Sequence, residues 1–146
     1  EICFILCYDS IMKDINKIQL PIGELKHLKV GLVYLFGSHA EGVAGKLSDV
    51  DIGVVFSDPR VSSRDTLEVY NILFDIFSLA LDTENVDIVF LERAFLELRF
   101  DVISHGKILF MESDDFRYDF EHRTTMLYAD FKPVLNNFDN AVLSRL

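Results

Sequence analysis

The feature that most constrains this chain is a glycine–serine pair, Gly37-Ser38, that ends an apolar run and is followed, after ten further residues, by Asp49 and Asp51. The apolar run at 30–36 reads as a buried strand. Because side chains alternate along a strand, Asp49 and Asp51 project from one face and can bind Mg²⁺ together. A glycine lets phosphate oxygens approach the backbone, and a serine hydroxyl adds a donor there. The pattern predicts a site for metal and phosphate.

Two further apolar runs accompany this motif. Residues 50–56 read as a second strand, and the run from Val86 to Leu91 reads as a third that holds one acid, Asp87. An ionised carboxylate in a buried strand is costly unless a cation or hydrogen-bond donors compensate it. If the third strand lies beside the second, Asp87 completes a cluster of three carboxylates, which implies a bound divalent metal. The alternatives are solvated aspartates in a β-turn and an Asp87 that points into water from an edge strand.

The bulk composition limits the classes of protein. The chain has 146 residues, of which 50% are hydrophobic, so we expect a single domain over residues 12–146. No apolar run reaches the ~18–20 residues that span a bilayer, so no membrane association is expected. The surplus of apolar residues favours a subunit interface, and therefore a homo- or hetero-oligomer. The net charge of −10, without a run of Lys or Arg, disfavours binding to long nucleic acid.

The N-terminal stretch differs from the rest. The chain begins with Glu1, and a more ordinary run opens at Met12, so residues 1–11 are expected to be a non-native or upstream extension whose deletion leaves stability and activity unchanged. Cys3 and Cys7 lie there without further cysteines or a nearby histidine. A disulfide framework or a metal site is therefore not expected for these cysteines. We expect a reduced, cytoplasmic protein.

Helical patterns alternate with the strands. The sequence predicts a short helix over 10–20 that ends at Pro21, helices over 22–29, 64–81 and 92–104, a strand over 107–111, and a long terminal helix that passes Pro133. Ser62 or Ser63 is expected to cap the third helix, and Ser113 the last. Phe95, Leu98 and Val102 are expected to share one face of the helix over 92–104. The last helix is expected to have an apolar side of Phe116, Phe120, Leu127 and Phe131 and, beyond Pro133, inward-facing Leu135, Phe138 and Val142. This C-terminal segment is apolar enough to dock on a partner, although packing on its own sheet is more common. Alternating strands and helices indicate a two-layer α/β domain.

The segments Leu35-Phe36-Gly37-Ser38, Ser48-Asp49-Val50-Asp51 and Val86-Asp87-Ile88-Val89 together resemble the polymerase-β-type nucleotidyltransferase superfamily. They are most similar to the minimal nucleotidyltransferases, the antitoxins of HEPN/MNT toxin–antitoxin pairs. The resemblance covers about residues 25–130. It implies an α/β (α+β) nucleotidyltransferase fold, a small mixed sheet flanked by helices with a long C-terminal helix.

The resemblance also implies an activity. Members of the family transfer AMP from ATP to a tyrosine hydroxyl of the HEPN toxin and so silence it. Carried over to this chain, Gly37 and Ser38 would hold the terminal phosphates of ATP, while Asp49 and Asp51 would contact the nucleotide and bind two Mg²⁺ ions. Asp87 would complete the catalytic and metal-binding set and help to deprotonate the acceptor.

One departure from the family follows the glycine–serine pair. The family pattern is Gly-Ser-Arg-x-Arg-Gly, whereas this chain reads Gly37-Ser38-His39-Ala40-Glu41-Gly42. His39 could donate to phosphate, although a lone histidine in a loop is more often solvated. A carboxylate such as Glu41 is unfavourable near a triphosphate unless it faces away. Basic residues that could supply the missing charge are Lys46, Arg60 and Arg64.

Three functions remain open at this stage. The predicted elements are nearly all used by the nucleotide-binding core, so the acceptor must arrive on another polypeptide, which favours adenylylation of a partner HEPN toxin. A small-molecule nucleotidyltransferase of the aminoglycoside type would suit the negative charge, but such enzymes carry a second helical domain. A catalytically inactive, toxin-binding antitoxin is favoured by His39 and Glu41 and disfavoured by the three retained aspartates.

Overall fold

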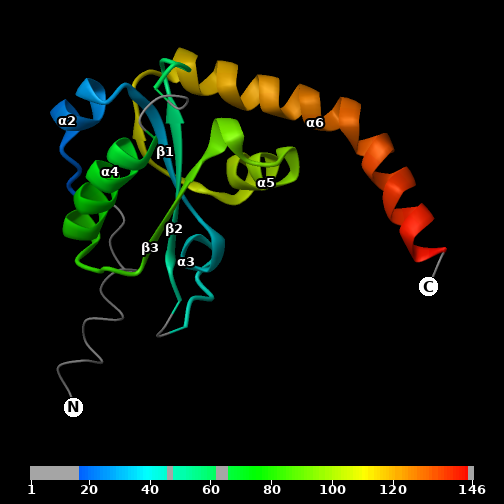
Figure 1. Cartoon of the computed structure of the whole chain (residues 1–146), viewed down its shortest axis with the longest axis horizontal. Helices are drawn as coiled ribbons and strands as arrows, with labels where there is room; N and C mark the ends of the chain where they lie inside the picture. The colour runs from blue at the N-terminus through cyan, green and yellow to red at the C-terminus, as the bar shows by residue number, and fades with distance from the viewer. Residues whose placement is uncertain (1–16, 46–47, 62–65, 145–146) are drawn as a thin grey trace.

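Four strands of the described chain form one mixed sheet in the order β3-β2-β1-β4. The computed structural model describes residues 17–45, 48–61 and 66–144 (Figure 1). The central strand β1 (Val30–Phe36) pairs antiparallel with β2 (Val50–Phe56) on one side and β4 (Lys107–Met111) on the other. β3 (Val86–Phe90) pairs parallel to β2 at the edge. The predicted strands are therefore confirmed, the third ending one residue early.

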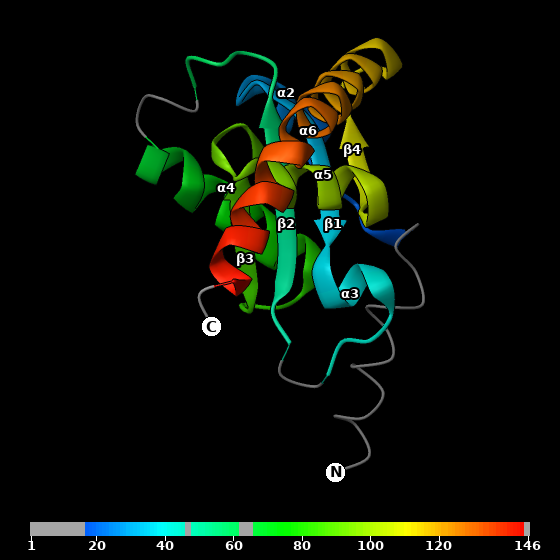
Figure 2. The same cartoon turned by 90° about the vertical axis from the view of Figure 1, so that its right-hand side faces the viewer.

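Helices cover both faces of this sheet. On one face, α2 (Ile22–His27) and α4 (Thr66–Leu81) pack against the even-numbered residues of β2, with Leu25 and Phe77 fully buried. On the other face, α5 (Leu96–His105) and α6 (Asp114–Leu143) pack against the alternate residues of β1 and β2 (Figure 2). The domain therefore has three layers instead of the two predicted, because both faces of β1 and β2 are apolar.

The helix predicted over 92–104 is wrong in its first part. A 3-10 turn, η2 (Leu91–Arg93), follows β3 directly, and α5 begins only at Leu96. The Glu92 carboxylate accepts a hydrogen bond from the backbone N–H of Phe56, at the end of β2. The Arg99 guanidinium donates to three backbone carbonyls of the connection, those of Leu91, Glu92 and Ala94. Side chains thus bind the backbone groups that a continuous helix would pair. Phe95, predicted to share one helix face with Val102, lies before α5 and is 86% exposed, whereas Val102 is fully buried.

Helix α6 begins as predicted and then leaves the sheet. Ser113 caps it, since its hydroxyl accepts a hydrogen bond from the N–H of Phe116 at 3.2 Å. Its first turns pack against the sheet through Phe116 and Phe120. Figure 1 shows its C-terminal half extending beyond the sheet. The expectation that the residues beyond Pro133 face inward is therefore wrong for Phe138 and Val142, which are 68% and 45% exposed. Leu127 and Phe131, on the predicted apolar side, are also exposed, at 52% and 43%.

Several predictions fall on residues outside the described ranges. They are the extension at 1–11, most of the helix over 10–20, and the caps Ser62 and Ser63. Within the described ranges, no helix combines the length and the apolar character needed to cross a membrane.

Candidate active site

The glycine–serine pair forms the sharp turn between β1 and a short helix. Gly37 is the first residue of α3 (Gly37–Glu41) and has φ +67°, in the left-handed region. A Cβ atom at Gly37 would lie 2.3 Å from Oδ2 of Asp51. Glycine is therefore required twice, for the backbone conformation and for the close approach of the Asp51 carboxylate. The sequence predicted that this glycine makes room for phosphate, and the structure shows that it also makes room for an acid.

The strand register brings two of the predicted acids side by side. Asp51 pairs with Phe36 across the antiparallel ladder and with Asp87 across the parallel one. Paired residues of neighbouring strands point to the same face, so both carboxylates lie on the face that α5 and α6 cover. β3 is an edge strand and Asp87 is exposed, yet its register keeps it next to Asp51. Asp49 is exposed and lies just before β2.

Asp87 and Asp49 both lie close enough to Asp51 to influence its ionisation. The pKa of Asp51 is raised above its ordinary value, first by burial and then by the negative charges of Asp87 and Asp49. The His39 imidazole acts in the opposite direction. Half-burial of Asp51 between two exposed acids makes its ionised form costly unless a cation neutralises it.

The residue types at this position are ones that bind Mg²⁺ when waters and the phosphates of a nucleotide supply the remaining ligands. Within the described residues, no group of three or more His, Cys, Asp or Glu side chains is already arranged to hold a metal ion. Mg²⁺ in proteins commonly uses one or two carboxylates, several waters and the phosphates of a nucleotide. The oxygen-only set of Asp49, Asp51 and Asp87 matches that preference, next to a turn suited to phosphate.

His39 is neither in a loop nor solvated. It lies in α3, is 4% exposed, and its Nε2 is 3.1 Å from the carbonyl oxygen of Ser48. Its Nδ1 is buried and has no hydrogen-bond partner among the described residues. Glu41, the last residue of α3, is exposed. A lone histidine carries no periodic signal, so this burial could not be predicted from the sequence.

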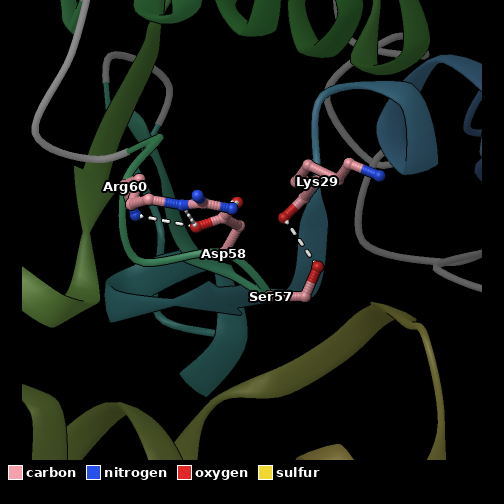
Figure 3. A network of polar contacts seen from close by, with 4 residues as sticks. All are labelled: Lys29, Ser57, Asp58 and Arg60. Atoms are coloured by element: carbon pink, nitrogen blue, oxygen red, sulfur yellow. Dashed lines mark hydrogen bonds and ion pairs between the residues drawn. The ribbon is translucent and has the colours of Figure 1, made fainter.

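Arg60 does not supply charge to the site. Asp51 stands at the start of β2, whereas Arg60 follows the other end of that strand and forms an ion pair of 2.8 Å with Asp58 (Figure 3). This guanidinium lowers the pKa of Asp58 to about 2. The neighbouring Ser57 hydroxyl donates to the carbonyl of Lys29 at 3.2 Å. The prediction for Arg60 is therefore wrong, while Lys46 and Arg64 lie outside the described residues.

The fold and the site define a nucleotidyltransferase of the polymerase beta type. The family described as polymerase beta, nucleotidyltransferase matches the chain over residues 22–115, which is more than half of it. The chain belongs to this family, as the sequence predicted.

Individual relatives agree with this assignment. The chain is 34% identical over 87 residues to the protein adenylyltransferase MntA of Shewanella oneidensis, a match that covers 60% of this chain and 58% of MntA. The match thus spans less than two thirds of that relative. A solved structure described as a toxin–antitoxin with AMP-PNP is similar at TM-score 0.63 and 29% identity, over 89% of this chain and 98% of the other. The MntA-HepT toxin–antitoxin is similar at TM-score 0.62 and 28% identity, over 88% and 96%.

Proposed function

We propose that this chain is a Mg²⁺-dependent nucleotidyltransferase that transfers AMP from ATP to a tyrosine hydroxyl of a HEPN-type toxin and so acts as its antitoxin. The single observation that carries the proposal is the position of Asp51, which lies against Gly37 and is paired in register with Asp87. Similarity to an adenylyltransferase and to a toxin–antitoxin structure with an ATP analogue supports it.

The turn at Gly37 and Ser38 is proposed to hold the terminal phosphates of ATP. The first amides of a helix have no intrahelical acceptor, and those of α3 follow β1 without a side-chain cap. Ser38 is partly exposed, so its hydroxyl can add a further donor beside these amides. Because Asp51 is in contact with the same turn, nucleotide bound there lies beside the carboxylates.

Asp49, Asp51 and Asp87 would hold Mg²⁺, which lowers the pKa of an acceptor hydroxyl and neutralises charge on the leaving pyrophosphate when it is bound. In the transfer, the tyrosine oxygen bonds to the α-phosphorus, and the bond from that phosphorus to the bridging oxygen breaks. Pyrophosphate leaves with the electron pair. Asp87 is exposed at the sheet edge and is proposed to take the hydroxyl proton.

The surface of α6 supports a protein acceptor over an aminoglycoside. Its distal half carries an exposed apolar row at helical spacing: Leu127, Phe131, Val134, Phe138 and Val142. This row continues the residues Phe116 and Phe120, which pack on the sheet face that also carries Asp51 and Asp87. A protein that covers the distal row therefore stands on the same side of the sheet as the carboxylates (Figure 1).

Labelled ATP tests the proposal. The protein, Mg²⁺ and the product of the neighbouring gene are incubated together, and the experiment is repeated with Asp49→Ala, with Asp51→Ala and with EDTA. We expect label on a partner tyrosine, located by mass spectrometry, and its loss in all three controls. Label on an aminoglycoside would contradict the protein acceptor. Inhibition of the partner that survives both substitutions, without label anywhere, would show an inactive, toxin-binding antitoxin.

A further inference from the structure

Asp49 lies between α3 and β2, outside both elements, and its side chain is exposed. Its direction therefore depends on how its two neighbours in the chain are held. On its C-terminal side, the N–H of Val50 donates to the carbonyl of Asn85 at 2.8 Å, which fixes the start of β2 to the residue before β3. On its N-terminal side the neighbouring residue, Ser48, must be held if Asp49 is to keep one direction.

Ser48 is held by His39. The carbonyl oxygen of Ser48 can only accept, so the Nε2 atom of His39, 3.1 Å away, is the donor and carries the proton. The ring is 4% exposed, so water does not compete for this bond. The other contacts of Ser48 are local, since its hydroxyl accepts from the N–H of Gly45 at 2.8 Å and its N–H donates back to the carbonyl of Gly45 at 3.1 Å. His39 thus connects this turn to α3.

The burial of His39 has a cost that packing alone does not explain. With the proton on Nε2, Nδ1 is an acceptor, and it is buried without a partner among the described residues. A buried polar atom without a partner destabilises the folded state, whereas an apolar side chain would fill the same space without that cost. An apolar residue at position 39 would therefore fill the space but could not form the hydrogen bond to Ser48.

We propose that His39 is a positioning residue for Asp49, which directs that carboxylate toward Asp51 through the carbonyl of Ser48. This inference rests on the proposed function of the same site. α3 begins at Gly37 and Ser38, so one short helix sets both the phosphate-binding turn and, through His39, the direction of Asp49.

Two substitutions of His39 separate hydrogen bonding from packing. His39→Gln keeps a donor near the position of Nε2, and His39→Leu keeps bulk without a donor. We expect His39→Leu to lower kcat by about 10- to 100-fold, as for other residues that orient metal ligands, with KM for ATP changed by less than about twofold. His39→Gln should stay within about threefold of the parent protein in both constants.

A binding measurement without turnover completes the test. Mn²⁺ affinity in the presence of a non-hydrolysable ATP analogue, followed by electron paramagnetic resonance, should fall in His39→Leu and recover in His39→Gln. In an Asp49→Ala background, His39→Leu should change Mn²⁺ affinity no further, because the carboxylate that it positions is gone. Asp49→Ala serves as the matched reference.

Unchanged kcat and Mn²⁺ affinity in His39→Leu, or effects of the two substitutions that simply add, would overturn the inference. If His39→Leu does not fold, His39→Asn replaces it, since its shorter amide does not reach the Ser48 carbonyl. A parent protein that binds Mn²⁺ and nucleotide but transfers no AMP would refute the proposed function, while the binding comparison would still decide the role of His39.

Discussion

Gly37→Ala tests whether the glycine at the turn is required by the neighbouring carboxylate. Two costs follow from the structure. An alanine at φ +67° occupies the left-handed region, which costs about 1–2 kcal/mol of folding free energy. The new Cβ would also lie 2.3 Å from Oδ2 of Asp51, at which distance real side chains do not meet. The carboxylate must therefore retreat by about 1 Å to reach a normal contact distance.

The expected effect on catalysis follows from that displacement. A shift of about 1 Å in a positioned group costs on the order of 100-fold in rate. We expect Gly37→Ala to lose about that factor in kcat for AMP transfer, together with about 1–2 kcal/mol of unfolding free energy. Initial rates with labelled ATP and urea denaturation measure the two effects separately.

Gly42→Ala is the matched control. Gly42 caps α3 at φ +76°, so an alanine there would be strained in the same way as an alanine at position 37. We expect it to lose about 1–2 kcal/mol of stability while keeping its transfer rate within about threefold. If Gly37→Ala kept the parent rate, the contact with Asp51 would have no catalytic role. If both variants lost the same rate, strain in α3 would be the cause instead.

Three further predictions concern other parts of the molecule. Tyr34→Phe removes the 2.9 Å hydrogen bond that the buried hydroxyl donates to Glu121 and should cost about 1 kcal/mol of unfolding free energy in urea; an unchanged midpoint would contradict this. Burial raises the pKa of Glu92, so its ionisation opposes folding increasingly as pH rises above the ordinary value of 4.5. The stability of Glu92→Gln relative to the parent should therefore increase with pH, and a difference independent of pH would refute this. Asp51→Asn should abolish transfer yet raise the melting temperature in EDTA, because it removes a half-buried charge repelled by Asp87; a lower melting temperature would contradict the reasoning.

The two central strands, β1 and β2, could be predicted because they are buried on both faces. β1 is buried at every position, so its sequence is one continuous apolar run bounded by polar or turn residues. Asp51 is the one charged residue of β2. Asp49 was expected to share a strand face with it, but Asp49 lies just before β2, so the two-residue period of that strand does not set its direction. The pairing of β2 with β3, which brings Asp87 beside Asp51, required only that consecutive parallel strands be neighbours.

The connection after β3 could not be predicted, because its cause is tertiary. The pattern at 92–104 has helical spacing, but Glu92 is used by the end of β2 and Arg99 by the carbonyls of the turn. These hydrogen-bond partners cannot be identified from the local sequence. The same holds for His39, whose acceptor Ser48 lies in a loop, and for Arg60, whose neighbour Asp58 is close in sequence but has no periodic pattern.

The apolar row on α6 shows that a periodic pattern predicts the side of a helix but not what that side contacts. Spacing correctly predicted that Phe120, Leu127 and Phe138 share one side of a helix. It could not predict which part of that side meets the chain's own sheet, because a 30-residue helix is longer than the face it covers. The sequence therefore predicted burial where the structure has exposure.

The position of Asp51 within β2 explains how an apolar sheet can carry an acidic site. Further along the same face of β2, Gly53 lies under Leu91 and Val55 is buried, so an acid there would be neutralised by desolvation. At the start of the strand, Asp51 is only half-buried. A carboxylate at this depth interacts with neighbouring charges through a lower dielectric than that of water, which strengthens its attraction for a cation. The partly buried acid of β2 therefore lies at the sheet end where β1 turns at Gly37, the end at which the site is proposed.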